Sequence, residues 1–200
     1  INDVGIDIKA IAAKYDFYQE FDLKVLDNLK YVVNQYNNEW FNEEIKKRDK
    51  INRTIITVDG EDAKDLDDAI SIVKNNDDTY ELGVYIADVS FFVRENSALD
   101  DEAFSRGTSV YLVDRVIPML PHKLSNDLCS LNEKTPKLVI ACIMTINKQG
   151  VVTDFEIKEA VIETKHRMTY TNVNKIIEGD EIVSQEYNDI VNDIHTMNEL

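Results

Sequence analysis

The chain has 200 residues, which is long enough for one domain with a buried core, or for one domain and an arm. Its content of 44% hydrophobic and 30% charged residues excludes a chain that is disordered throughout. The net charge of −16 counts against a general nucleic-acid-binding module, because its field repels polyanions, but it does not exclude a local site for one.

The cysteines and the chain ends bear on where the protein works. Cys129 and Cys142 have no CxxC spacing, so neither a zinc site nor a disulfide framework is indicated, and a reducing cytoplasm fits best. No apolar run approaches the ~20 residues of a membrane span, and residues 1–10 lack the regions of a signal peptide. The first residue is not Met, and the last residues have a helical pattern without a cap. We therefore expect a cytoplasmic protein, without a membrane partner, of which this chain is a fragment.

Residues 1–50 have helical patterns. Apolar residues predict a short helix over 6–14, and spacings of three and four predict a longer one over 22–38, with Asp22 as its cap. Residues 42–50 are polar and are expected to be helical. We interpret residues 1–50 as a helical lead-in to the main domain.

β-Branched residues dominate from Ile51 onward. Strands are predicted at 56–58, 69–73 and 80–93. The turn signal NNDD separates the last two of these segments, so we expect them to form an antiparallel hairpin.

The rest of the chain alternates between helical and extended patterns. A helix is predicted between Ser97, its cap, and Gly107, which ends it, followed by an extended piece at 109–113 and a helical turn near 121–126. Strands are predicted at 137–146 and 151–164. A helix capped by Thr171 or Asn172 and closed by Gly179 follows, and then a helical face from Ile182. The turn NKQG joins the two long strands into a second hairpin. This order predicts an α+β fold, with a mixed, mainly antiparallel sheet and packed helices.

An acidic stretch lies between the first two predicted strands. The ten residues 59–68 hold six carboxylates, whereas the chain average of 38 acidic residues in 200 gives about two. Charge runs are commonly solvated loops, but like charges this close also repel, and a cation would neutralise them. Oxygen donors without Cys or His suit Mg²⁺, Mn²⁺ or Ca²⁺ rather than zinc. The stretch alone leaves both interpretations open.

A calcium-sensor loop is excluded by spacing. Counting a 12-residue loop from Asp65 puts Ile70 where glycine is needed and Asn76 where the bidentate glutamate belongs. Predicted strands, rather than helices, flank the stretch.

Three linked segments resemble the catalytic (RNB) domain of the ribonuclease II and ribonuclease R family. They are TVDGEDAKDLDDA at 57–69, YIADVS at 85–90 and the run at 97–131. The version VDGEDAKD is more similar to ribonuclease R. The resemblance covers about residues 50–178, and residues 3–21 resemble the lead-in that follows the family's cold-shock domains.

The resemblance implies a domain organisation. Residues 1–50 are the lead-in after absent cold-shock domains, and residues 51–200 are the N-terminal part of an RNB-type catalytic domain that is truncated at its C-terminus. A flanking OB-fold RNA-binding domain is expected in the full-length chain. The family's arginine-rich motif, which supplies a transition-state cation, lies downstream of Leu200, so the isolated fragment is expected to be nearly inactive.

The resemblance also implies an activity. It predicts a processive, hydrolytic 3′-to-5′ exoribonuclease that depends on Mg²⁺, with Mn²⁺ as a substitute, acts on the 3′ end of single-stranded RNA and releases nucleoside 5′-monophosphates. Two metals ~3.5 to 4 Å apart can activate a water and neutralise the scissile phosphate. The alternative is a non-catalytic RNA-binding or scaffold relative of the same fold, but the intact aspartate set described next argues against it.

The family's four-aspartate site falls on Asp59, Asp65, Asp67 and Asp68, which are implied as catalytic residues and metal ligands. The position of Asp67 is especially critical for chemistry in the family. Glu61 and Asp62 match no family ligand, so we expect them to be solvated or to support the ligands. Asp88 has either a structural hydrogen-bonding role, which we favour, or a role as a direct ligand.

The resemblance also implies RNA contacts. Tyr111 matches the family's terminal stacking tyrosine, and Tyr170 matches a second aromatic residue near the RNA path. The alternative for each is a tyrosine of the core or its rim. Four arginine and lysine residues are candidates for phosphate contacts, or for pairing with surface carboxylates: Arg115, Lys123, Arg106 and Arg167.

Other residues carry no expected role in the chemistry. The three histidines match no metal spacing or triad. Phe91 and Phe92 stand where relatives commonly have His and Tyr, a change that is not expected to affect the reaction.

Overall fold

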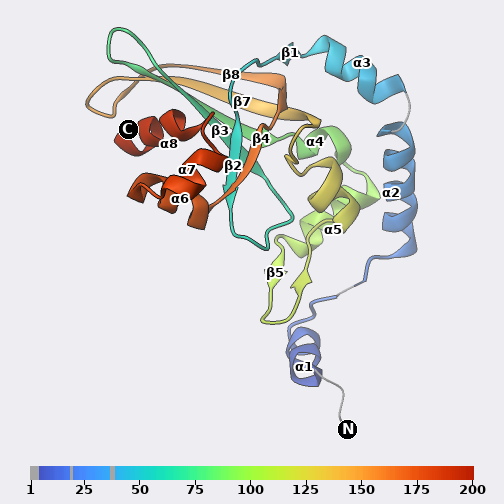
Figure 1. The fold of residues 1–200 in the computed structure, drawn as a ribbon. Helices are drawn as coiled ribbons and strands as arrows, with labels where there is room; N and C mark the ends of the chain where they lie inside the picture. Colours follow the sequence, from blue (N-terminus) through green and yellow to red (C-terminus); the bar gives the residue numbers. More distant parts are fainter. Residues whose placement is uncertain (1–4, 19, 37–38) are drawn as a thin grey trace. The chain divides into compact units, whose positions relative to one another are not determined.

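The computed structural model describes residues 5–18, 20–36 and 39–200 (Figure 1). By its internal contacts the chain divides into two compact units. We call residues 1–42 with 89–125 the helical unit, and residues 43–88 with 126–200 the sheet unit. The predicted helix over 22–38 and the lead-in segment 3–21 each include a few positions that lie outside the described residues.

The helical unit is built mainly from short helices and one small hairpin. Its elements are α1 (Ile6–Lys14), α2 (Leu23–Tyr36), the start of α3 (Glu39–Lys47), α4 (Val89–Phe92), α5 (Ala98–Arg106), β5 (Val110–Tyr111) and β6 (Val116–Ile117). The predicted caps of α5 are confirmed: the Ser97 hydroxyl accepts a hydrogen bond from the backbone N–H of Asp100, and Gly107 adopts a φ of 71°. β5 and β6 pair antiparallel, so the piece predicted at 109–113 is shorter than expected.

The strand predicted over 80–93 is too long. β4 (Tyr80–Ala87) ends before α4, where the N–H of Val93 bonds the carbonyl of Val89 at 2.9 Å and closes a helical turn. A strand would send Phe91 and Phe92 to opposite faces, whereas the turn buries both in one aromatic cluster. The Phe91 ring stacks on Trp40, with centroids 4.3 Å apart.

The sheet unit is organised around one seven-stranded sheet with the order β1-β8-β7-β4-β3-β2-β9. Its strands are β1 (Asp49–Lys50), β2 (Ile56–Asp59), β3 (Asp68–Lys74), β4, β7 (Pro136–Ile146), β8 (Val152–Glu163) and β9 (His166–Thr169). Only β1 with β8 and β2 with β9 pair in parallel among the described strands of this sheet. Both predicted hairpins, β3 with β4 and β7 with β8, are confirmed, as is the mixed, mainly antiparallel α+β fold.

Three helices pack on one part of this sheet, beside β2 and β3 in Figure 1: α6 (Tyr170–Glu178), α7 (Glu181–Glu186) and α8 (Val191–Glu199). Their shared core is fully buried and consists of Ile56, Met168, Ile176, Ile190 and Ile194. The cap of α6 is Thr169 rather than Thr171 or Asn172, since its hydroxyl accepts from the N–H of Asn172. The helical face predicted from Ile182 is interrupted, because the N–H of Ile190 bonds the carbonyl of Tyr187 in a turn between α7 and α8.

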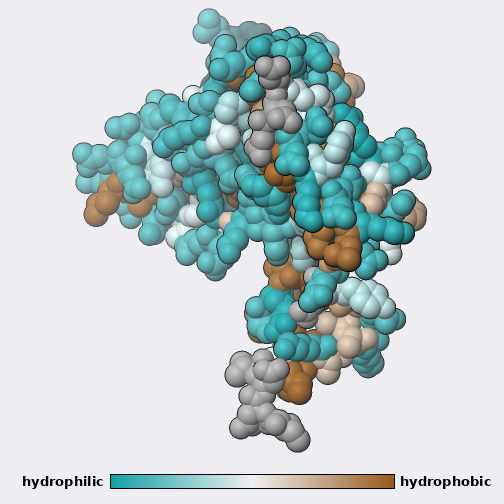
Figure 2. All heavy atoms as spheres, turned by 90° about the vertical axis from the view of Figure 1, so that its right-hand side faces the viewer, coloured by the Kyte–Doolittle hydropathy of each residue, from teal (hydrophilic) through white to brown (hydrophobic). Residues whose placement is uncertain are grey.

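The segment predicted to hold a helical turn near 121–126 forms a π-helical turn at Leu124–Leu128. The face shown in Figure 2 is predominantly hydrophilic, with scattered hydrophobic residues, as the charge content leads one to expect. Of the helices that the structure describes, none has the length and apolar character of a membrane span.

Candidate functional site

The acidic loop, residues 60–67, connects β2 to β3 in the sheet unit. Asp59 is the last residue of β2 and Asp68 is the first of β3, and the two strands are antiparallel neighbours. Antiparallel strands joined by one loop place these two ends at the same edge of the sheet. The loop supplies Asp65 and Asp67, so all four predicted aspartates gather at this edge.

The pKa values show that the four carboxylates act on one another. Partial burial raises the pKa of Asp67 first, and the charges of Asp65, Asp68 and Asp59 raise it further, although the side chain reaches solvent. Burial also raises the pKa of Asp59, as do the charges of Asp68 and Asp65, while the Arg167 cation opposes them. The structure therefore brings the four predicted residues into one electrostatic cluster.

The donor set suits a hard divalent cation. All four side chains offer only carboxylate oxygens. Burial first and mutual repulsion second raise the pKa values of Asp59 and Asp67, and a bound cation offsets both effects. Among the residues that the structure describes, no three His, Cys, Asp or Glu side chains are arranged as a ready-made metal cage. The residues fit a cation by the chemistry of their donor oxygens, at one edge of the sheet.

The acidic loop is attached to the sheet unit by contacts from distant parts of the chain. The Ser130 hydroxyl bonds the backbone of Lys64 and Leu66, and the Leu66 side chain is buried. Arg167 donates to the carbonyls of Glu61 and Ala63. The side chains of Glu61 and Asp62 are exposed, which agrees with a solvated role.

Asp88 lies just beyond β4 in a buried ion pair. Arg48 Nη1 and Asp88 Oδ2 are 2.7 Å apart, and the two side chains are only 5% and 3% exposed. The N–H of Asp88 donates to the carbonyl of Leu138 at 3.0 Å, and the N–H of Ala87 donates to the carbonyl of Asp67 at 2.9 Å. The ion pair and the bond to Leu138 favour the structural interpretation of Asp88, and its neighbour Ala87 joins the end of β4 to the acidic loop.

The predicted RNA-contact residues fall in both units. Tyr170 begins α6 in the sheet unit and follows Thr169, which pairs in register with Asp59, so it lies at the same end of the sheet as the aspartates. Tyr111 lies in β5 of the helical unit and is 66% exposed. Arg115, also in the helical unit, bonds Asp114 through Nη2 at 2.7 Å and lowers the pKa of that carboxyl. Both tyrosines present accessible rings.

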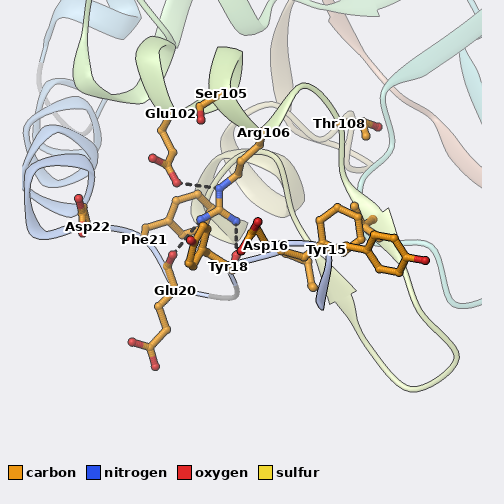
Figure 3. Close-up of a pocket in the computed structure, with 13 residues that line it drawn as sticks. Tyr15, Asp16, Tyr18, Glu20, Phe21, Asp22, Glu102, Ser105, Arg106 and Thr108 are labelled. Atoms are coloured by element: carbon orange, nitrogen blue, oxygen red, sulfur yellow. Dashed lines mark hydrogen bonds and ion pairs between the residues drawn. The ribbon is translucent and has the colours of Figure 1, made fainter. Parts of the chain in front are cut away.

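Arg106 is a sequence candidate for phosphate contact, but its guanidinium is engaged within the helical unit. It lies at a pocket of about 980 Å³ (Figure 3) and donates to Glu102 and to the carbonyls of Tyr18, Glu20 and Pro118, at 2.8 to 3.1 Å. It also lies 4.0 Å from the centroid of the Phe21 ring. These bonds hold Tyr18 and Glu20 against α5, which assigns Arg106 a structural role.

Two residues in these contacts have no role that the sequence predicts, namely Ser130 and Arg48. Ser130 is part of the segment 97–131 that resembles the family, but its partners are 64 and 66 residues away along the chain. Arg48 is one of several cations in a polar helical stretch, and no local pattern distinguishes it from its exposed neighbours. The contacts of Ser130 with the loop and of Arg48 with Asp88 join residues far apart in the chain, so they form only when the sheet has brought these residues together.

Comparisons with known proteins agree on one family. The family model of the RNB domain matches residues 47–200. Ribonuclease R 1 of Lactococcus lactis is 45% identical over 199 residues, 100% of this chain and 24% of the relative. Ribonuclease R of Thermotoga maritima is 43% identical over 180 residues, 89% of this chain and 25% of the relative. The chain thus spans about a quarter of the length of these curated relatives.

Solved structures show the same fold. Mycoplasma genitalium RNase R in complex with ribose-methylated single-stranded RNA has a TM-score of 0.80 and 31% identity, covering 98% of this chain and 31% of that one. Yeast Ssd1, a pseudonuclease, has a TM-score of 0.61 and 18% identity, covering 72% of this chain and 18% of that one, and shares the fold alone.

Proposed function

This chain belongs to the RNB-domain family, and from that premise we propose that it is part of a ribonuclease R-like exoribonuclease whose catalytic centre is the aspartate cluster between β2 and β3. The observation that carries the proposal is the gathering of Asp59, Asp65, Asp67 and Asp68 at one edge of the sheet, inside the matched region. A non-catalytic relative has no need to keep four mutually repelling carboxylates together.

The four aspartates would hold divalent cations, Mg²⁺ or Mn²⁺, through their carboxylate oxygens. When bound, such cations lower the pKa of a water and offset charge on the scissile phosphate. The chain's own residues prepare this chemistry: the β2 and β3 ends fix Asp59 and Asp68, and the acidic loop presents Asp65 and Asp67 between them. Water would attack the phosphorus of the last phosphodiester and the P–O3′ bond would break. The terminal nucleotide then leaves as a nucleoside 5′-monophosphate, and the shortened RNA keeps a 3′-hydroxyl.

The 3′ end of single-stranded RNA is the proposed substrate. Tyr111 and Tyr170 would stack on bases, which needs no particular sequence because every base has a flat face. Arg115 would contact a phosphate through its guanidinium. We place the intact protein in the cytoplasm, with cold-shock and OB-fold domains that extend its grip on RNA.

The proposal is tested with the intact protein and one RNA carrying a different label at each end. In Mg²⁺ we expect the 3′ label to be released at once as a nucleoside 5′-monophosphate. The 5′ label should pass from full-length RNA to short end products with few intermediates, because a processive enzyme degrades each RNA to the end before it releases it. EDTA should stop both changes, because the carboxylates then lack a cation. RNA that is bound and stays intact would support a scaffold instead, and a 5′ label released first would contradict the direction.

Replacing Tyr111 by Ala should weaken binding of single-stranded RNA by about 10- to 100-fold, because one stacked base contributes about 1–3 kcal/mol. Fluorescence anisotropy with EDTA present measures this binding without turnover. Tyr31→Ala is a matched control, since Tyr31 lies in α2 of the same unit and is 63% exposed. Equal affinities of the two variants would remove Tyr111 from the RNA site.

A further inference from the structure

The acidic loop has a positioning problem that its own residues do not solve. Its carboxylates repel one another, and a short loop under such repulsion spreads unless it is held from outside. Among the described contacts within the loop, one backbone hydrogen bond joins the N–H of Ala63 to the carbonyl of Gly60, at 3.2 Å. The other loop residues are held from outside the loop, by backbone bonds from Ala87 and Leu131 and by two distant side chains, Ser130 and Arg167.

Ser130 holds the second half of the loop. Its hydroxyl, which is fully buried, donates to the carbonyl of Lys64 and accepts from the N–H of Leu66, each at 3.1 Å. The next residue, Leu131, donates its N–H to the carbonyl of Leu66 at 2.9 Å. These three bonds grip the backbone on both sides of Asp65 and directly before Asp67.

Arg167 holds the first half. From β9 its Nη2 donates to the carbonyls of Glu61 and Ala63, at 3.0 and 2.5 Å. β9 pairs with β2, where Arg167 is in register with Thr57, so the same strand that lies beside Asp59 also fixes the loop that follows it. The backbone N–H of Arg167 is itself held by the Glu133 carboxylate.

We propose that Ser130 and Arg167 are positioning residues that set the spacing of Asp59, Asp65, Asp67 and Asp68 for divalent cations. This inference rests on the proposed function of the aspartate cluster. Each residue acts through loop backbone rather than by contact with a cation or RNA. Loss of the Ser130 hydroxyl leaves the buried N–H of Leu66 and the partly buried carbonyl of Lys64 without this partner, and the loop must shift to satisfy the N–H.

The test for Ser130 is Mn²⁺ binding by the intact protein, measured by electron paramagnetic resonance, beside the steady-state kinetics of RNA degradation in Mg²⁺. Ser130→Ala should weaken Mn²⁺ binding by about 10- to 100-fold, as loss of a residue that orients ligands does elsewhere. We expect kcat to fall at limiting Mg²⁺ and to recover in part at high Mg²⁺, with KM for RNA unchanged.

Ser71→Ala is the matched control. Ser71 is 1% exposed, bonds the Tyr85 hydroxyl at 2.7 Å within the same sheet and has no described contact with the acidic loop. Both variants lose one buried hydroxyl and both can lower thermal stability, but only Ser130→Ala should alter Mn²⁺ affinity. Equal Mn²⁺ affinities and equal kcat values for the two variants would overturn the role of Ser130.

Arg167→Lys separates positioning from charge. Both bonds come from Nη2. Lysine keeps the positive charge, but its Nζ is one atom closer to the backbone than Nη2, so it cannot occupy the position from which Nη2 reaches both carbonyls. We expect Mn²⁺ binding to weaken as in Ser130→Ala, while Arg53→Lys, which changes an arginine paired with Glu81 in the same unit, should bind as wild type does. Wild-type affinity in Arg167→Lys would show that charge alone matters and would overturn the positioning role.

Failure of this inference is distinct from failure of the proposed function. If the wild-type protein degrades RNA and the variants bind Mn²⁺ as wild type does, the positioning role is wrong and the proposed function stands. Wild-type protein that binds Mn²⁺ but leaves RNA intact would sink the exoribonuclease, and the Mn²⁺ affinities of the variants would still decide the positioning role.

Discussion

Replacing Asp67 by Asn in the intact protein is expected to slow release of the 3′-terminal nucleotide by about a thousandfold, at unchanged affinity for RNA. The substitution keeps size and shape, but it removes one negative charge from the residue whose pKa responds to all three other aspartates. Loss of a single preorganised polar group in a catalytic centre lowers rates by about 10²- to 10³-fold, and a lost ligand lies at the upper end of this range.

The same variant should be no less stable than wild type without divalent cations. A raised pKa means that folding disfavours the charged form of Asp67. At low pH the carboxyl is protonated and does not lower the free energy of unfolding. As pH rises through the pKa of the folded state, the charged Asp67 lowers the free energy of unfolding increasingly. At neutral pH the wild-type loop carries this repulsion, whereas the neutral amide of the Asp67→Asn variant does not contribute to it.

Asp62→Asn is the control for both measurements, because Asp62 lies in the same loop with an exposed side chain. Its rate and unfolding temperature should match those of wild type. An Asp67→Asn variant that releases nucleotides at the wild-type rate would remove Asp67 from the reaction. One that unfolds well below wild type without cations would show that Asp67 stabilises the fold instead.

Replacing Asp88 by Ala should lower the free energy of unfolding of the sheet unit by about 3 kcal/mol, the lower end of the range for a broken buried pair, because the buried Arg48 guanidinium loses one of its two close counter-charges and keeps Glu44. Burial opposes the charge on Arg48, yet its bonds to Glu44 and Asp88 outweigh burial and raise its pKa. The effect is measured by calorimetric or chemical unfolding of the intact protein, in the transition that contains this unit.

Two variants sharpen that test. Asp49→Ala removes a carboxylate from the neighbouring exposed pair with Lys158, where the Asp49 side chain is 72% exposed, and should change stability by no more than about 1 kcal/mol. The double variant Arg48→Met with Asp88→Leu removes both buried charges and should recover most of the loss. An Asp88→Ala variant as stable as Asp49→Ala would contradict the structural role of the pair.

The elements of the fold that can be predicted from the sequence are those determined by residues close together in the chain. NNDD and NKQG lie between β-rich runs, so both hairpins could be predicted from local turn chemistry. Ser97 and Gly107 mark the ends of α5 in the same way. The parallel pairings of β1 with β8 and β2 with β9 join segments about 110 residues apart, and no local pattern specifies such partners.

α4 shows where local patterns mislead. Its residues are β-formers, and the sequence predicts that the strand continues through Phe92. Burial of both phenylalanines in one aromatic cluster outweighs that propensity, which is a tertiary effect.

In the candidate site, too, some features can be predicted from the sequence and others cannot. The density of carboxylates in residues 59–68 pointed to the four aspartates, and the family resemblance selected them from six. The attachments of the loop could not be foreseen, because a serine or an arginine looks the same in sequence whether it binds a phosphate, pairs with a surface charge or holds a loop. Arg167 is a sequence candidate for phosphate contact and instead bonds two loop carbonyls.

We expect the aspartate cluster to bind the divalent cation on which RNA degradation depends. The most direct measurement is Mn²⁺ titration of the intact protein, comparing wild type, Asp67→Asn and Asp62→Asn by electron paramagnetic resonance. We expect Mn²⁺ to bind wild type and Asp62→Asn with equal affinity, and to bind Asp67→Asn at least about tenfold more weakly. Mn²⁺ affinity that is the same in all three proteins, or absent from wild type, would contradict it.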